Sequence, residues 1–322
     1  MRGSIRRVAA VAVLFHRSVA PVTTLASAAF INPRGSTTTN NNSSRNMTCL
    51  STDRYVLHRM DSLESTQDET RRLLRDHDDK KQVLAVTCDE QTKGRGTSGR
   101  QWIGTKGNVF LTVAIPAQKV PVMITLLPLQ VGTIVANTIS KLLVDCGAPS
   151  ESKVTLKWPN DVLVNQRKIS GVLIESELLE GDSWFLIGIG VNLVHAPDVP
   201  TSGPNRGRPS TSVQNLCHQA AGNDQMEENE SKSTMEGMDA SAVAAEITSE
   251  LVDFVHQDLP KDVLSREVIA GWKKWAEFGK QQVLRDVEGN EIVVPIGIEA
   301  DGQLRVRGQD GQERLLVADY LL

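Results

Sequence analysis

Runs of β-branched and apolar residues recur from about residue 55 onward, and turn residues bound each run. Short runs of this kind are typical of β-strands. The spacing predicts strands at 83–87, 108–115, 154–158, 162–164, 169–177 and 184–193. Asn165-Gln166-Arg167 is expected to connect two of them as a hairpin.

Other segments carry apolar residues at helical spacing. The pattern predicts helices at 122–145, 241–256 and 263–276. A shorter helix is expected to run from Thr66 to about Arg75, with Thr66 as its N-cap and Glu69 as the capping-box partner. Strands and helices together predict an α+β domain.

The composition changes in two polar stretches and again near the end of the chain. Residues 197–210 contain four prolines, and residues 221–240 contain six acidic residues and one lysine. Both are predicted to be solvent-exposed insertions. After residue 279, short strands separated by Gly-containing turns predict a small β-barrel of roughly 40 residues.

The first 52 residues contain six arginines and no Lys, Asp or Glu. An Arg-rich, acid-free start is typical of organelle transit segments, and the apolar run 8–15 followed by small residues also fits a signal peptide. The sequence at 26–30, Ala-Ser-Ala-Ala-Phe, resembles the front of bipartite plastid presequences. We expect a plastid address ahead of a mitochondrial one, and a cytosolic product if translation starts at Met47.

The tract 36–44 is expected to be disordered. The pattern therefore divides the chain into a targeting or disordered segment (1–52), a main domain (53–278) and a C-terminal domain (279–322).

Charge and cysteine usage exclude several classes of protein. The net charge is −4 overall, and the chain beyond residue 52 holds 29 basic against 39 acidic residues, which argues against nucleic-acid binding through bulk charge. The sequence contains no run of 18 apolar residues, so no transmembrane helix is expected. The cysteines at 49, 88, 146 and 217 form no C-x-x-C pair, so neither a disulfide framework nor a zinc site is expected, and a reducing compartment is favoured.

The loop at 91–102 holds three glycines within six residues and two arginines, Arg95 and Arg100. Its backbone amides and guanidinium groups are suited to phosphate or carboxylate oxygens. It is neither a Walker loop, because no Gly-Lys-Ser/Thr closes it, nor a dinucleotide fingerprint, because it opens no helix. The plainer interpretation is a basic turn between strands.

Two further segments carry polar residues in suggestive positions. Lys157-Trp158-Pro159-Asn160-Asp161, followed by Lys168 and Gly171, is suited to a phosphate and its Mg²⁺, or is a strand-ending turn with solvated charges. In Leu-Ile-Gly-Ile-Gly-Val-Asn-Leu at 186–193, the glycines indicate a bulge or a close approach of the backbone, and Asn192 either contacts a ligand or starts a turn.

In this order, the segments resemble those of the biotin–protein ligases, and the resemblance runs from about residue 60 to 322 without the two insertions. Ser65-Thr66-Gln67 stands where that family has Ser-Thr-Asn. Gly-Arg-Gly-Thr-Ser-Gly-Arg-Gln-Trp resembles its Gly-Arg-Gly-Arg-x-Gly-x-x-Trp loop, with Thr97 in place of the second arginine. Lys-Trp-Pro-Asn-Asp, Lys168-x-x-Gly171 and Asn192 are kept.

The resemblance implies a mixed β-sheet backed by helices and an SH3-like C-terminal barrel. It implies that biotin and ATP form biotinoyl-5′-AMP with Mg²⁺, and that a lysine of a biotin carboxyl carrier domain then accepts the biotin. It assigns catalysis to Lys168 and Arg95; biotin binding to Ser65, Thr66, Gln67, Gln91, Gly94, Arg95, Gly96, Lys168 and Gly171; adenylate binding to Arg95, Arg100, Trp102, Asn160 and Asn192; and Mg²⁺ to Asp161.

Three other interpretations compete with this one. A lipoate–protein ligase or octanoyltransferase has the same fold and a catalytic lysine, but the Gly-Arg-Gly loop with its Trp and Lys-Trp-Pro-Asn-Asp favour biotin. A biotin-responsive repressor needs a helix-turn-helix, and the first 52 residues lack that periodicity. A catalytically inactive binding module leaves Lys168, Arg95 and Asp161 unexplained. A homodimer is left open, and neither nucleic acid nor a membrane is an expected partner.

Overall fold

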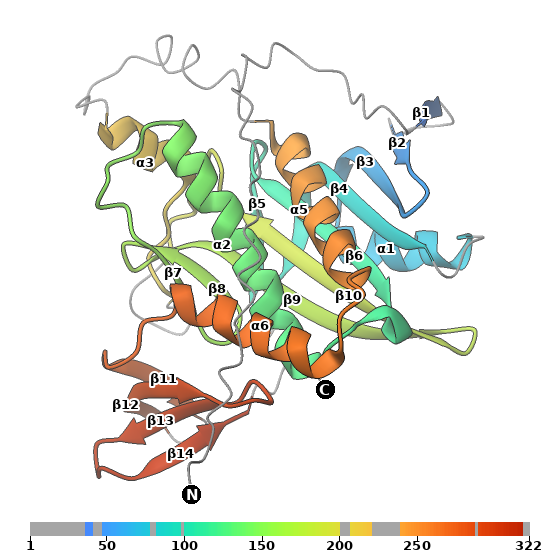
Figure 1. The fold of residues 1–322 in the computed structure, drawn as a ribbon. Coiled ribbons are helices and arrows are strands. Elements are labelled where there is room, and N and C mark those ends of the chain that lie inside the picture. The colour runs from blue at the N-terminus through green and yellow to red at the C-terminus, as the bar shows by residue number, and fades with distance from the viewer. Residues whose placement is uncertain are drawn as a thin grey trace, which may run out of the picture.

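The structure is a computed structural model, and it describes residues 36–40, 47–77, 82–97, 100–199, 207–220, 239–286 and 289–317. A large mixed sheet dominates the fold, with strand order β1-β2-β3-β4-β6-β10-β9-β8-β7 and β5 paired to β4 (Figure 1). Its strands are β1 (Ser36–Asn40), β2 (Met47–Ser51), β3 (Tyr55–Leu63), β4 (Val83–Arg95), β5 (Gln101–Gly104), β6 (Val109–Pro116), β7 (Val154–Lys157), β8 (Asp161–Val164), β9 (Arg167–Leu179) and β10 (Asp182–Val191). Only β3 and β4 pair in parallel, so the predicted mixed sheet is confirmed.

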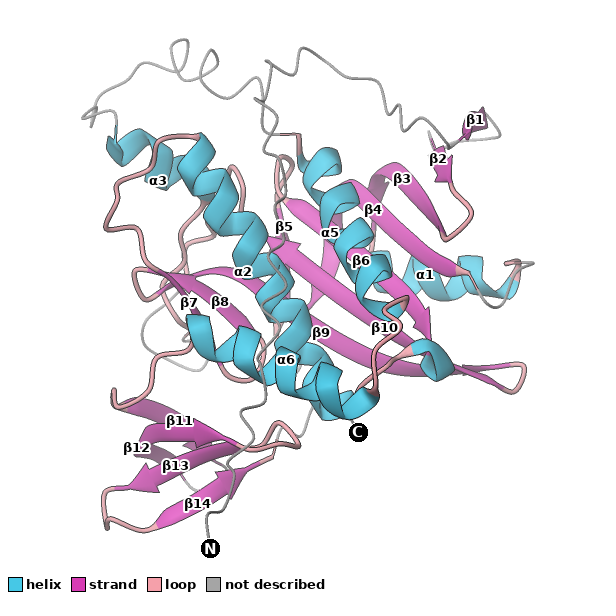
Figure 2. Cartoon of the chain, in the orientation of Figure 1, coloured by secondary structure: helices cyan, strands magenta, loops and turns pink. Residues whose placement is uncertain are grey.

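Helices cover both faces of this sheet. The helices are α1 (Thr66–Arg75), α2 (Leu127–Asp145), α3 (Val213–Ala220), α5 (Ala240–Val255) and α6 (Lys261–Trp275), with short 3₁₀ turns at Ala117–Lys119 and Ile124–Leu126. Figure 2 shows α2, α5 and α6 in front of the strands, where they share the main core. The α1 residue Leu74 packs with Leu84, Trp184 and Leu186, which alternate along their strands with residues of the main core. Helix α1 therefore lies on the opposite face.

The central strand β6 shows why the sequence folds this way. All eight of its residues are buried, because β4 and β10 flank it and helices cover both of its faces. The continuous apolar run that predicted a strand at 108–115 is the sequence signature of that position.

Helix α2 packs across the sheet next to α5 and α6. Among the described residues, the segment from Ile124 to Asp145 is long and apolar enough to cross a membrane by length and composition. However, 67% of its most apolar window is buried inside the protein, as in a central core helix.

The C-terminal region forms a separate antiparallel sheet of β11 (Gln282–Asp286), β12 (Gly289–Ile298), β13 (Leu304–Gly308) and β14 (Glu313–Leu316). The indole Nε1 of Trp158 donates a hydrogen bond of 3.0 Å to the Gly302 carbonyl. The turn at 158–160, which belongs to the sequence motif Lys-Trp-Pro-Asn-Asp, thus contacts this second sheet directly.

The N-terminal boundary differs from the prediction. Residues 36–40 were expected to be disordered, and 47–51 were assigned to the targeting or disordered segment, yet they form β1 and β2, and β2 pairs with β3. Leu50 is buried in the main core, which provides the apolar contact that a polar tract alone lacks. Residues 1–35, which carry the predicted address, lie outside the described residues.

The start of α1 also differs in detail. The N-cap is Ser65 and not Thr66, and no side chain caps the helix. Glu69 pairs instead with Arg72, one turn further on, at 2.6 Å. The capping box is absent because Thr66 is engaged elsewhere, in the pocket described below.

The expectation of free cysteines was wrong for one pair. Cys146, at the end of α2, forms a disulfide with Cys217 of α3, with Cα atoms 5.8 Å apart. Helix α3 was not predicted, and without it nothing in the sequence brings these two residues together across 71 positions. Cys49 and Cys88 are free.

Removing this disulfide is expected to destabilise the protein measurably. A bond across 71 positions restricts the unfolded chain, so Cys217→Ser should lower the free energy of unfolding by about 4 kcal/mol. Urea unfolding of wild type with and without a dithiol reductant measures the same effect, and Cys49→Ser serves as the control. A wild-type curve that reductant leaves unchanged would contradict the bond.

A second prediction concerns Glu277, whose carboxylate receives hydrogen bonds from Lys153, Gln166 and Lys280. Burial alone would raise its pKa, but these partners lower the pKa to about 2. Its ionised form therefore contributes stability above its ordinary pKa of 4.5, and this contribution is lost as the pH falls toward 2. Thermal unfolding should rank wild type above Glu277→Gln at pH 7, with the difference shrinking below pH 4.5. A constant difference would contradict this assignment.

Candidate active site

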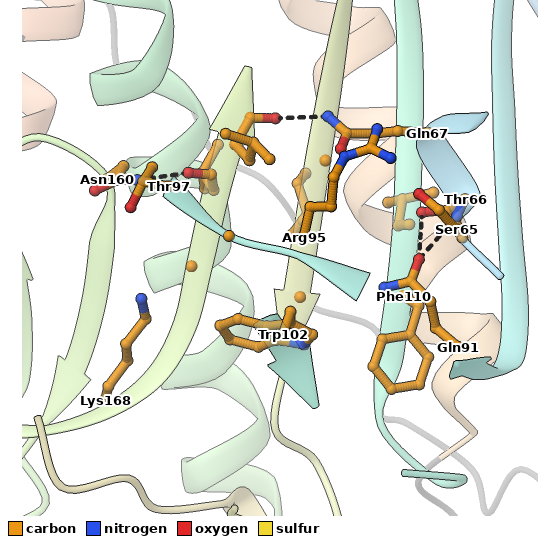
Figure 3. Close-up of a pocket in the computed structure, with 18 residues that line it drawn as sticks. Ser65, Thr66, Gln67, Gln91, Arg95, Thr97, Trp102, Phe110, Asn160 and Lys168 are labelled. Carbon is orange, nitrogen blue, oxygen red and sulfur yellow. Dashed lines mark hydrogen bonds between the residues drawn. The ribbon is translucent and has the colours of Figure 1, made fainter. Parts of the chain in front are cut away.

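A pocket opens on the α1 face of the sheet, between the start of α1, the β4–β5 loop and strands β6, β9 and β10 (Figure 3). It encloses about 490 Å³ of empty space, part of it open to solvent. Ten residues predicted to form the site line it: Ser65, Thr66, Gln67, Gln91, Arg95, Gly96, Trp102, Asn160, Lys168 and Gly171. Four predicted residues do not: Gly94, Arg100, Asp161 and Asn192.

A buried chain of hydrogen bonds fixes one end of the pocket. The backbone N–H and the hydroxyl of Thr66 both donate to Oε1 of Gln91, at 2.8 and 3.1 Å. Thr112 on β6 donates its hydroxyl to Thr66 Oγ1 at 2.8 Å. Since Oε1 of Gln91 accepts both bonds, its Nε2 remains to donate to a bound molecule. Sequence reasoning missed Thr112, although a hydroxyl within the apolar run 108–115 was a visible signal.

Gln67 closes the same end of the pocket from α1. Its Nε2 donates to the Leu173 carbonyl of β9 at 3.3 Å. A Cβ atom at Gly188 would lie 3.1 Å from the Gln67 amide, so the longer side chain fits because β10 has a glycine there. Gly188 on β10 therefore makes room for Gln67, which stands where the similar family has Asn.

The loop glycine Gly94 does not line the pocket, but it allows two pocket residues to approach one another. A Cβ atom there would lie 2.4 Å from Nε2 of Gln91 and 2.5 Å from the Trp102 carbonyl. Any side chain at Gly94 would therefore displace either the amide of Gln91 or strand β5.

Trp102 lies flat against a depression in the sheet. Gly171 and Gly190 are cross-strand partners on β9 and β10, and a Cβ atom on either would meet the indole, at 3.1 and 2.3 Å respectively. The close approach that the paired glycines predicted is thus made by this side chain. Its buried Nε1 has no hydrogen-bond partner among the described residues, which leaves a donor at the pocket.

Lys168 marks the other end of the pocket. Its ammonium lies 2.6 Å from Asp161 and 5.4 Å from the centre of the Trp102 ring. Figure 3 labels Lys168 and Trp102. Burial alone would raise the pKa of Asp161, but Lys168, Lys157 and Arg100 bring it below its ordinary value. Beside this pair, Asn160 donates its Nδ2 to the Val172 carbonyl at 2.6 Å.

Asp161 was predicted to bind Mg²⁺, and the geometry gives it another role. Its carboxylate neutralises Lys168, and the described residues contain no group of three or more His, Cys, Asp or Glu side chains placed to hold a metal. One carboxylate already paired with a lysine does not fit a resident metal ion. Mg²⁺ is consistent with this site only as an ion that arrives on a nucleotide.

The two arginines of the loop have partners within the protein. Arg95 forms ion pairs with Asp68 of α1 and Glu175 of β9, at 2.7 and 3.3 Å. Arg100 donates to the carbonyl and the hydroxyl of Thr97. Thr97, which replaces a family arginine, therefore holds Arg100 against its own loop.

Asn192 is buried and does not line the pocket. Its Nδ2 donates to the Thr211 carbonyl at 3.1 Å, and its Oδ1 has no partner among the described residues. Thr211 directly follows the insertion predicted at 197–210, so this bond holds the end of that insertion. That prediction was wrong for this part, because Ser210 is buried and bridges to Lys168.

The segment that lines this pocket is similar to a known family. Residues 60–192 match the model of the Biotin/lipoate A/B protein ligase family.

The curated relatives carry the names of ligases. The biotin–[acetyl-CoA-carboxylase] ligase of Paracoccus denitrificans is 36% identical over 131 residues, which cover 40% of this chain and 52% of that protein. The bifunctional ligase/repressor BirA of Escherichia coli is 30% identical over 44% of this chain and 38% of its own length. The matched segment thus spans about half or less of these relatives.

Solved structures extend the similarity along the chain. Biotin protein ligase from Leishmania major in complex with biotin superposes with a TM-score of 0.54 and 27% identity, covering 82% of this chain and 98% of that one. Its complex with biotinyl-5-AMP gives a TM-score of 0.51. The main domain therefore has the biotin ligase fold.

Proposed function

We propose that this protein is a biotin–protein ligase, which activates biotin with ATP and transfers it to a lysine of a biotin carboxyl carrier domain. The observation that carries the proposal is the pocket itself, with hydrogen-bonding amides at one end and Lys168 at the other. A molecule with a polar head group and a terminal carboxylate spans such a pocket with its carboxylate at the lysine.

In the first step, a carboxylate oxygen of biotin attacks the α-phosphorus of ATP, and pyrophosphate leaves. The Lys168 ammonium neutralises charge on the carboxylate and the α-phosphate as the new bond forms, which lowers the barrier because that charge is concentrated in the transition state. Gln91 Nε2, Ser65 and Gln67 hold the head group, so that the carboxylate reaches Lys168. Asp161 keeps the ammonium in position through its 2.6 Å ion pair.

In the second step, the lysine amine of the carrier attacks the carbonyl of the mixed anhydride, and AMP leaves. Trp102 limits the access of water to that carbonyl, because its indole covers Gly171 of β9 and Gly190 of β10 beside the Lys168 ammonium. Mg²⁺ enters in this scheme with ATP and is not held by the empty protein. The C-terminal sheet is proposed to close as an SH3-like barrel beside the turn at Trp158.

The exchange of labelled pyrophosphate into ATP, measured with biotin, lipoate and octanoate in parallel, tests the first step. Biotin alone should support exchange, and a biotin carboxyl carrier domain should then gain the mass of one biotinyl group. Exchange with lipoate or octanoate and none with biotin would reject the proposal. Transfer to a carrier variant whose acceptor lysine is replaced by arginine is the control, and it should be absent.

A lipoate or octanoate ligase is the second candidate, because the matched family covers both activities. The named relatives and the Trp-containing loop favour biotin. The same three-substrate assay separates the two.

We also propose that residues 1–52 direct the protein to an organelle, with a plastid favoured over a mitochondrion. The support is compositional, since this segment has six arginines and no acidic residue. A reporter carrying residues 1–52 should enter an organelle, and a product that starts at Met47 should stay in the cytosol. A diffuse signal from both would reject the address.

A further inference from the structure

Four cations gather beyond the Lys168 end of the pocket. They are Lys157 at the end of β7, Lys168, Arg100 and Arg208. Asp161 is the register partner of Lys157 and lies 2.6 Å from Lys168, and Lys168 bridges to Ser210, two residues after Arg208. Burial lowers the pKa of Lys157, Asp161 raises it, and Arg208, Lys168 and Arg100 lower it further, because each of these cations lies near Lys157. Among the described residues, Asp161 is the carboxylate that acts on Lys157, and it is already paired with Lys168.

In the part of the chain that the structure describes, neither Lys157 nor Arg208 forms an ion pair, and the nearby Asp161 is paired with Lys168. The only hydrogen bond of the Arg208 guanidinium there goes from Nη1 to the Gln166 carbonyl, at 3.2 Å. The Lys157 side chain has no hydrogen bond and no ion pair there, and Asp161, its register partner on β8, is paired with Lys168. Several cations held around one carboxylate that is already paired cost the fold free energy, which a bound anion offsets.

The fold places Arg208 here through the segment 207–211, which runs beside the start of β9. The Lys168 N–H donates to the Pro209 carbonyl at 2.8 Å, and the Thr211 N–H donates to the Lys168 carbonyl at 3.0 Å. Arg167 adds a bond from Nε to the Ser210 carbonyl at 2.9 Å. Arg208 is therefore carried on backbone that is anchored on both sides of Lys168.

The position of the cluster indicates what the anion is. Lys168 and Asn160 line the pocket, whereas Lys157, Arg100 and Arg208 lie outside it. An α-phosphate at Lys168 would have the biotin carboxylate on its pocket side. The remaining phosphates would then extend away from the pocket, toward the cluster, because attack and departure at phosphorus are roughly in line.

We propose that Arg208, together with Lys157, binds the β- and γ-phosphates of ATP and then the pyrophosphate that leaves. This inference rests on the proposed function, and it assigns a binding role to the end of a segment predicted to be a solvent-exposed insertion. A guanidinium and an ammonium from two different elements hold the leaving group while Lys168 remains with the atoms that react.

The test is calorimetric binding of pyrophosphate to the full chain, together with the steady-state KM values for ATP and biotin. Arg208→Gln should weaken pyrophosphate binding and raise the KM for ATP, each by about tenfold, the scale of one charge-assisted hydrogen bond. The KM for biotin should stay within about twofold. Arg208→Lys should recover most of the loss, because it keeps the charge, and Lys157→Gln should resemble Arg208→Gln.

Arg54→Ala is the matched control, since it removes an exposed arginine paired with Asp253 and should change neither constant. If Arg208 only supports the loop through Gln166, Arg208→Gln will lower thermal stability and alter both KM values alike, and the proposal is overturned. Unchanged pyrophosphate binding in Arg208→Gln overturns it as well. If the proposed function is wrong, wild type will not use biotin as a substrate. The effect of Arg208→Gln on pyrophosphate binding can still be measured in that case, so the two failures are distinguishable.

Discussion

Replacing Lys168 by alanine is expected to slow biotin-dependent exchange of pyrophosphate into ATP by about a hundredfold or more. This is the scale on which single preorganised groups stabilise transition-state charge. The ammonium lies 2.6 Å from Asp161, where the pocket meets the cluster of cations. No other cation among the described residues lines the pocket at this end. Exchange at the wild-type rate in Lys168→Ala would mean that the side chain is only a surface lysine.

Stability must be measured alongside, because Lys168→Ala leaves the half-buried Asp161 carboxylate with less compensation. The double variant Lys168→Ala/Asp161→Asn removes that charge as well and should fold as wild type does while remaining slow. Lys168→Arg keeps the positive charge and moves it. Partial activity in Lys168→Arg, with none in the double variant, would separate the effect of charge from the effect of position.

Replacing Gly190 by alanine is expected to reduce activity at least tenfold while the sheet persists. The new Cβ atom would lie 2.3 Å from the Trp102 indole, and the indole is a side chain on a short outer strand, whereas Gly190 is fixed between β6 and β9. The indole is therefore the part that moves, and the intermediate loses its cover. Release of biotinoyl-AMP into solution should rise as coupled transfer falls.

Gly297→Ala is the control for this change. Gly297 also lies in a strand, at a bulge of the C-terminal sheet, and an added Cβ atom there meets nothing within 4 Å. It should leave exchange and transfer unchanged. Wild-type coupling in Gly190→Ala would show that Trp102 does not shield the adenylate.

Much of the fold follows from local pattern. The buried strand at 108–115, the hairpin at Asn165-Gln166 and the long helix ending at Asp145 lie where their spacing predicted, because each is specified by residues close together in the chain. Strand β2 and helix α3 were missed because their apolar contacts are few and are supplied by distant segments. Ten residues that line the pocket were predicted through the resemblance to a known family, but the ion pairs around them were not. Whether Arg95 lies against Asp68 or a ligand depends on α1 and β9, and no local sequence pattern records that.

The bond between Cys146 and Cys217 has a topological consequence for this site. It closes residues 146–217 into a covalent ring, and the ring contains Lys157, Asp161, Lys168, Gly190 and Arg208, whereas Thr66, Gln91 and Trp102 lie outside it. The residues proposed to bind the phosphates, Lys157, Lys168 and Arg208, thus lie in one closed loop. The residues proposed to bind the head group, such as Gln91, lie in the open chain. A single peptide-bond cleavage anywhere inside the ring leaves both fragments linked, so they separate on a gel only after reduction.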